Sequence, residues 1–155
     1  MASITPQEVE AHQLWLQSEG TEGKQADETG LDLSGADLAG LNLARGQFVG
    51  TVFDHAYLSG TNFSGADFSG ATFEGADLTA ADLSGADLGG VTLSGANLTG
   101  ANLKGADLSG ARLVGCNLSH ADFTDADLIA ADLSGSLQSC MILTGAKLND
   151  TQGLD

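Results

Sequence analysis

A five-residue phrase repeats through most of this chain. Residues 66–110 read ADFSG, ATFEG, ADLTA, ADLSG, ADLGG, VTLSG, ANLTG, ANLKG and ADLSG. Every fifth residue is Leu or Phe, and a small residue usually stands two places before it. A period of five matches neither the 3.6 residues of a helical turn nor the simple alternation of a flat strand. It therefore predicts a solenoid, in which each unit is stable only against its neighbours.

The side-chain pattern within one unit explains how the chain would coil. Alternate side chains of an extended segment point to opposite sides. With Leu108 as the central residue, Ala106 faces inward beside it while Asp107 faces water. Gly110 then supplies the backbone freedom for a bend. Each unit is one short side plus one corner, so successive units turn the same way and stack.

Motifs such as Ala-Asp-Leu-Ser-Gly and Ala-Asn-Leu-Thr-Gly resemble the pentapeptide repeat family, and the resemblance runs from Leu31 to about Asp150. It implies an all-β solenoid, a right-handed quadrilateral β-helix with four pentapeptides per coil. The twenty-four units centred on Leu33 to Leu148 would then form about six coils, spaced ~4.8 Å apart. We expect an N-terminal capping helix and polar loop over residues 1–30, the β-helix over 31–150 and a short tail over 151–155.

The large central residues should stack between coils. All six Phe residues are centres, and residues twenty apart should lie over each other. This places Phe48 over Phe68 and Phe53 over Phe73, and Gly46 leaves room for the ring of Phe48. We interpret this cluster as core packing.

The segment before the array predicts a helix from Thr5 to about Ser18. Thr5 and Glu8 fit a capping box, and Pro6 suits the first helical position. The apolar residues of this helix are Ala11, Leu14, Trp15 and Leu16. We expect a lid over the first coil, whose edge would otherwise expose unpaired backbone groups. The alternative is a partner-binding helix that displays Trp15.

The same segment has a second, shorter resemblance. The run from His12 to Leu16, followed by Gly20, Gly23 and Ala26-Asp27, is similar to leaders that precede such arrays in many small bacterial pentapeptide proteins. Residues 21–30, which are polar and contain glycine, are expected to form a loop.

The chain is strongly acidic, with 21 Asp and Glu against 5 Lys and Arg, a net charge of −16. Much of this follows from the repeat, because ten of the twenty-four outward positions before a centre are Asp. A twenty-residue coil would align four of them in one outward column, Asp67, Asp87, Asp107 and Asp127. Like charges in a column should raise one another's pKa values. These aspartates are either ordinary residues of the repeat, whose charges are screened by water and salt, or they form a strip that a basic partner recognises or a cation bridges.

The last coil departs from the outward-polar rule. Leu137 and Ile142 occupy outward positions, Met141 is a bulky inward residue, and Gln138 is the one centre that is neither Leu nor Phe. An uncovered edge with apolar neighbours predicts a weak homodimer through the C-terminal coil. The alternative is a one-residue slip that buries Leu137 and exposes Gln138.

No catalytic constellation is recognisable, and no cofactor or metal is expected. His12, His55 and His120 should lie far apart, on the lid and on two corners. Cys116 replaces a small inward residue and should pack as a hydrophobe, while Cys140 falls at a corner.

The function that these features favour is a non-enzymatic scaffold or protein-interaction module with an unknown protein partner. The alternative is an acidic DNA mimic that binds a topoisomerase or another nucleic-acid-binding protein. Direct nucleic-acid binding is not expected of so acidic a chain. No apolar run approaches the ~18 residues of a membrane span, and residues 1–10 lack the pattern of a signal peptide. We therefore expect a cytoplasmic protein without a membrane contact.

Overall fold

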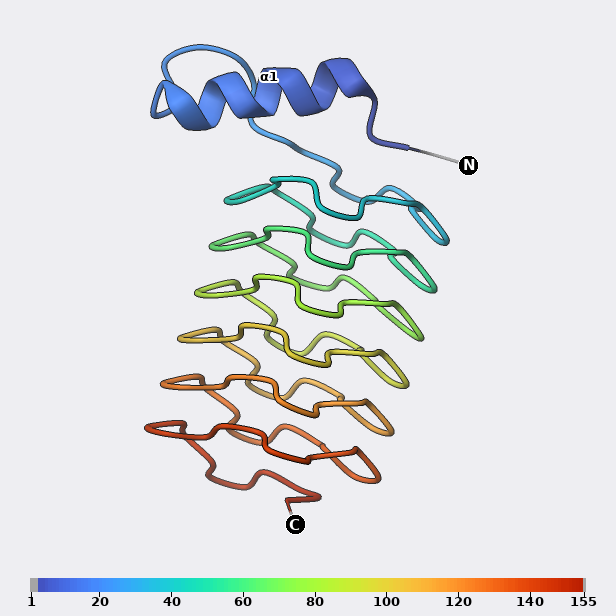
Figure 1. Ribbon diagram of the computed structural model, residues 1–155, viewed down its shortest axis with the longest axis vertical. Coiled ribbons are helices and arrows are strands. Elements are labelled where there is room, and N and C mark those ends of the chain that lie inside the picture. The colour runs from blue at the N-terminus through green and yellow to red at the C-terminus, as the bar shows by residue number, and fades with distance from the viewer. Residues whose placement is uncertain (1–2, 155) are drawn as a thin grey trace.

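The computed structural model describes residues 3–154, which form one helix and a stack of coils (Figure 1). The helix is α1 (Pro6–Gln17), and the coils are joined by isolated parallel β-bridges. Each bridge joins residues twenty positions apart, from Asp27 with Gln47 to Asp132 with Gln152. Twenty residues are four pentapeptides, so the chain forms the expected right-handed quadrilateral β-helix.

The corners between pentapeptides have a left-handed backbone. Gly110, for example, has a φ of 65°. Eight corners adopt this conformation without glycine: Arg45, His55, Ala80, His120, Asp125, Ala130, Cys140 and Asp150. A left-handed residue with a Cβ costs ~1–2 kcal/mol, so the stacking of neighbouring coils offsets that cost at these positions.

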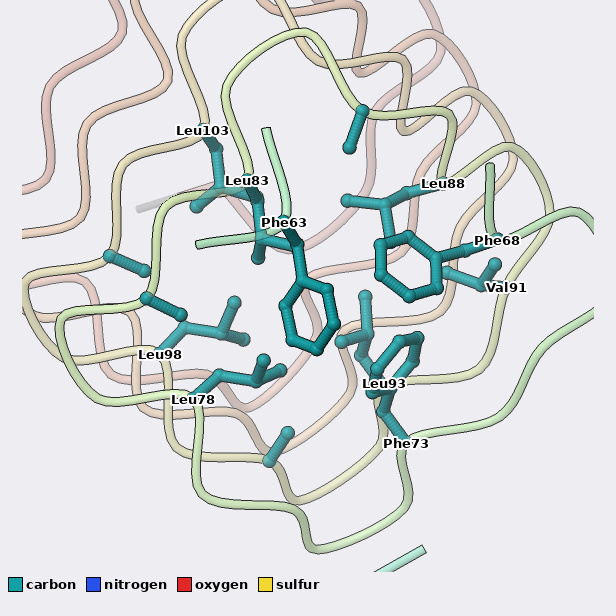
Figure 2. Packing of buried hydrophobic residues seen from close by; sticks show 14 of the residues in the cluster. Phe63, Phe68, Phe73, Leu78, Leu83, Leu88, Val91, Leu93, Leu98 and Leu103 are labelled. Carbon is teal, nitrogen blue, oxygen red and sulfur yellow. The ribbon is translucent and has the colours of Figure 1, made fainter. Parts of the chain in front are cut away.

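The core is a column of central side chains inside the coils. Centres such as Phe63, Phe68 and Phe73 point into the interior and are fully buried (Figure 2). Burial of each such side chain stabilises the fold by ~1.5–3 kcal/mol, counted as an upper estimate.

The predicted aromatic stacking is confirmed. The ring centroids of Phe48 and Phe68 lie 5.2 Å apart, and those of Phe53 and Phe73 lie 4.9 Å apart with nearly parallel planes. A Cβ built on Gly46 would lie 2.5 Å from the ring atom Cε2 of Phe48. Glycine is therefore required at that position by the larger ring.

Helix α1 lies across the N-terminal end of the stack and caps it (Figure 1). Thr5 is its N-cap, and Thr5 and Glu8 form both hydrogen bonds of the predicted capping box. The side-chain amide of Gln13 donates to the carbonyl oxygen of Asn42 at 2.7 Å. One coil lower, the equivalent oxygen of Asn62 accepts from the backbone N–H of Leu43. The helix thus replaces the missing coil as a hydrogen-bond donor.

The bridged coil extends beyond both ends of the array read from the sequence. Asp27 is bridged and Glu28 is buried, so residues 26–30 form a further pentapeptide rather than a loop. At the other end Gln152 is bridged to Asp132. Backbone pairing needs only the five-residue spacing, which continues where the central residue is no longer apolar.

Across residues 3–154, no helix is long and apolar enough to cross a membrane.

Candidate interaction surfaces

The four aspartates predicted to align do form one outward column. β-Bridges connect Asp67 to Asp87, Asp87 to Asp107 and Asp107 to Asp127. We call these four residues the acidic column. Asp87 and Asp107 in its middle are exposed, and the two end residues are partly covered. Bridged neighbours in adjacent coils lie at the ordinary interstrand spacing of ~4.8 Å.

Each aspartate of the column also has a local structural role. Its Oδ1 atom accepts a hydrogen bond from the backbone N–H two residues later, as Ser69 donates to Asp67 at 2.9 Å and Ser109 to Asp107 at 2.8 Å. Such Asx turns tie the side chain to the corner that follows. The side-chain oxygen of Asn can accept the same hydrogen bond. An Asp→Asn substitution therefore removes the charge and keeps the turn.

The lower end of the column is neutralised. The ammonium group of Lys147 lies 2.8 Å from Oδ2 of Asp127. The hydrogen bond from Lys147, with a further one from the N–H of Ile129, lowers the pKa of Asp127. For Asp127 the expectation of a raised pKa is therefore wrong, because the ammonium group of Lys147 donates a hydrogen bond to its carboxylate. The remaining charges at Asp67, Asp87 and Asp107 form the open stretch of the column.

The C-terminal coil keeps its register. Leu137 is bridged to Asn117 and Ile142 to Asp122, so both side chains point outward, with exposed fractions of 62% and 44%. Gln138 remains a centre, and its amide donates to the carbonyl oxygen of Gly153. The alternative of a one-residue slip is therefore excluded.

The last described coil is hollowed beside these residues. A hollow of about 570 Å³ is lined by Ser136, Leu137, Gln138, Ser139, Met141, Leu143 and Leu154. Within residues 3–154, the backbone N–H groups of Leu143 and Leu148 have no backbone acceptor. In a longer rod both groups would pair with a seventh coil. The C-terminal coil thus combines apolar side chains with a free edge.

The buried face of the capping helix differs from the prediction at two residues. Leu14 is exposed, while Trp15 and Leu16 are half-buried and His12 is fully buried. The guanidinium carbon of Arg45 lies 5.3 Å above the ring of Trp15. This geometry covers Trp15 and supports the role of a lid over that of a displayed partner site.

The sequence did not predict the roles of two residues at the junction of lid and rod. His12 accepts a hydrogen bond from the N–H of Ala26, and Glu28 is a buried centre. The signal for Glu28 was present, because it stands five residues before Leu33 and follows the template pair Ala26-Asp27. The signal for His12 was not, since its partner is a backbone group fourteen residues away.

The two cysteines lie in different environments. Cys116 is buried, and its thiol donates to the carbonyl oxygen of Leu93. Burial raises the pKa of Cys116 to about 11, so the thiol stays protonated. Cys140 is exposed at its corner. In the described part of the chain, no group of three or more His, Cys, Asp or Glu residues is placed to hold a metal ion.

A stack of four-sided coils with a period of five residues defines a short-period β-solenoid. A family model described as pentapeptide repeats matches this chain in eight copies, over residues 32–70, 47–85, 56–95, 76–113 and 101–137. The chain belongs to the pentapeptide repeat family. No curated protein matches it.

Several solved structures are similar. HetL, a pentapeptide repeat protein involved in the regulation of heterocyst differentiation in the cyanobacterium Nostoc, is 30% identical over 83% of this chain and 68% of its own, with a TM-score of 0.41. A pentapeptide repeat protein from the thylakoid lumen of Arabidopsis thaliana is 41% identical over 63% and 68%, with a TM-score of 0.38. The full-length structure of QnrB1, a plasmid-mediated fluoroquinolone resistance protein, is 21% identical over 82% and 84%, with a TM-score of 0.33.

Proposed function

We propose that this protein is a non-enzymatic interaction module that binds a protein partner through the open stretch of the acidic column. The observation that carries the proposal is the alignment of Asp67, Asp87 and Asp107 on one face. Among the described residues, none of these three carboxylates forms a salt bridge such as that of Asp127 with Lys147. A row of fixed carboxylates suits a partner that presents Lys and Arg side chains in a row.

The backbone beneath the column supports this role. The N–H of Asp87 donates to Ala66 at 2.9 Å, and that of Asp107 donates to Ala86 at 3.0 Å. Each aspartate is further held by its Asx turn. The carboxylates are therefore fixed before a partner arrives, and a preorganised surface loses less conformational entropy on binding.

The charge density of the rod bears on the alternative, an acidic DNA mimic for a topoisomerase or another nucleic-acid-binding protein. Residues 31–150 carry fourteen carboxylate side chains against four Lys and Arg. Over six coils of ~4.8 Å, this is about one net negative charge per 3 Å. Duplex DNA carries one per ~1.7 Å of its axis. The rod is thus less charged than DNA, and a general protein-binding role fits it better.

The experiment is affinity capture from the native host with three immobilised proteins. The first is the wild type, and the second carries Asp67→Asn, Asp87→Asn and Asp107→Asn. The third is a matched control with Asp77→Asn, Asp82→Asn and Asp132→Asn, which removes three charges from other faces where Asp also forms Asx turns. Bound proteins are identified by mass spectrometry.

We expect a stoichiometric partner that the wild type and the control retain and the column variant loses. Equal capture by both triple variants would refute a role for the column. Competition by duplex DNA for the captured partner would favour the DNA mimic, and inhibition of gyrase supercoiling tests that alternative directly.

A further inference from the structure

Glu28 occupies a position that belongs to the hydrophobic core. It is the central residue of the first pentapeptide, Ala26 to Gly30, where the next centre, Leu33, is fully buried. Glu28 itself is only 5% exposed. A carboxylate in such a place is costly to bury unless it is paired.

The carboxylate of Glu28 has no partner among residues 3–154, where the salt bridges are those of Lys104 with Asp122 and of Lys147 with Asp127. None of the side-chain hydrogen bonds within this range reaches it either; the bond from the Thr51 hydroxyl goes to the backbone carbonyl of Glu28. Burial raises the pKa of Glu28, and the nearby charges of Glu8 and Asp27 raise it further. Glu28 is therefore a largely buried acid without a protein partner in this range, although its carboxylate oxygens are not among the fully enclosed unpaired atoms, which are His12 Nε2 and Thr72 Oγ1.

A cavity of about 160 Å³ lies against this side chain. The first turns of α1 form one wall and the start of the first coil forms the other, with the lining residues Gln7, Glu8, Ala11, Lys24, Gln25, Ala26, Asp27 and Glu28. Three of these residues are acids and one is basic. The cavity thus lies at the junction of lid and rod, and the buried carboxylate lines it.

We propose that this cavity binds a monovalent organic cation headed by a guanidinium or ammonium group, with Glu28 as its ionic partner. A bound cation would give the Glu28 carboxylate the ionic partner that no described residue provides. Guanidinium suits this best, because its planar fork matches a carboxylate with two parallel hydrogen bonds.

The size of the cavity and the donors around it agree with this class of ligand. A cavity of ~150 Å³ accepts a molecule of the size of benzene, and a methylguanidinium ion is smaller. A divalent metal does not fit, since Ca²⁺ takes 6–8 oxygen ligands and the described residues offer no such set. A single carboxylate without an ionic partner among residues 3–154 instead matches a single positive charge.

Lys24 determines how strongly the cavity attracts a cation. Its exposed side chain lines the mouth, and its charge opposes those of Glu8 and Asp27. Removal of this charge should strengthen binding. Because the two walls belong to α1 and to the first coil, a bound cation should also hold the lid on the rod and stabilise the folded chain.

The experiment is an NMR titration of the full chain at low ionic strength, following the backbone amides of Asp27 and Glu28. The probes are methylguanidinium and N-acetylarginine amide, with N-acetylcitrulline amide as the neutral isostere and NaCl as the ionic-strength control. The variants are Glu28→Gln and Lys24→Gln, with Glu74→Gln as a matched loss of an exposed carboxylate. Gln138 shows that this chain accommodates glutamine at a centre.

We expect saturable shifts of these amide signals with the charged probes only. The affinity should fall at least tenfold in Glu28→Gln and rise in Lys24→Gln. It should not change in Glu74→Gln. Saturation by methylguanidinium identifies a free small cation as sufficient, whereas a response to the arginine probe alone identifies a basic side chain of a partner. Binding should weaken as the pH falls and Glu28 takes up a proton, and the melting temperature should rise with probe concentration.

Absence of saturable shifts with both charged probes, or equal affinity in Glu28→Gln and wild type, would overturn the proposal. The Asp67/Asp87/Asp107 variant should bind the probes as the wild type does. The test is therefore independent of the function proposed for the acidic column.

Discussion

The Nδ1 atom of His12 accepts a hydrogen bond from the backbone N–H of Ala26 at 3.0 Å, in a fully buried contact between α1 and the first coil. The ring of His12 also stacks on Trp15, with centroids 5.7 Å apart. An accepting nitrogen carries no proton, so the contact requires the neutral imidazole. His12 therefore joins the lid to the rod in a form that depends on pH.

We predict that His12 makes the protein sensitive to mild acid. Burial lowers the pKa of His12 from its usual value of 6.5, and the charge of Arg45 lowers it further, against an opposing contribution from the Ala44 carbonyl. As the pH falls, the unfolded chain takes up the proton first. The stability that His12 contributes is therefore complete above pH 6.5, and it is lost as the pH falls through the lowered folded pKa.

The variant His12→Phe tests this dependence. It keeps a ring beside Trp15 but leaves the buried N–H of Ala26 unpaired, which should cost ~1–3 kcal/mol at pH 7.5. Melting temperatures at pH 7.5 and 5.5 should differ less for His12→Phe than for the wild type. The exposed His120, changed to Asn, is the control and should keep the wild-type difference. An unchanged difference in His12→Phe would contradict the prediction.

We predict that Gly46 and Phe48 depend on each other. Gly46→Ala would place its Cβ 2.5 Å from the Phe48 ring, and such overpacking typically costs ~1–3 kcal/mol. Phe48→Leu should remove most of that penalty, because Ala before Leu is the standard pair of this array. Denaturant unfolding of both single variants and the double variant measures the coupling. Additive effects would show that the ring does not set the choice of glycine.

We predict that the open stretch of the acidic column is under repulsion. Asp87→Asn with Asp107→Asn keeps both Asx-turn acceptors and removes two charges, so it should raise the melting temperature by roughly 1–2 °C at low salt. The gain should shrink in 0.5 M NaCl. Asp127→Asn should give no gain, because it also removes the partner of Lys147. A loss of stability in the double variant would indicate that these carboxylates hold a cation.

We predict that the chain self-associates weakly through its C-terminal coil. The exposed side chains of Leu137 and Ile142 offer a template for a second copy. So do the N–H groups of Leu143 and Leu148, which have no backbone acceptor within residues 3–154. The contact area is small, so the dimer should appear only at high concentration.

Sedimentation velocity of the wild type and of Leu137→Asp/Ile142→Asp measures this association. Tyr57→Asp, which changes an exposed outward residue on the second coil, is the control. Wild type and control should show a concentration-dependent dimer that the double variant lacks. A monomeric wild type at high concentration would reject the dimer.

The β-helix and its core could be predicted from the sequence because the five-residue pattern acts locally and repeats. Each unit specifies an inward centre, an outward neighbour and a corner, and identical spacing then determines which residues stack. The resemblance to the family supplied four units per coil, and the stacking of Phe53 on Phe73 and the alignment of Asp67 with Asp87 follow from that number.

The contacts at the two ends were decided only by the tertiary structure. The twenty-residue period places Lys147 next to Asp127 in the column. The sequence alone could not show that its ammonium group reaches the carboxylate, that Gln138 stays in register, or that His12 binds the backbone of Ala26. These contacts depend on the rotamer of a long side chain and on where the lid lies across the rod, and no periodic pattern encodes either. The repeat therefore determines the rod, while the contacts at the lid junction and in the C-terminal coil depend on packing in three dimensions.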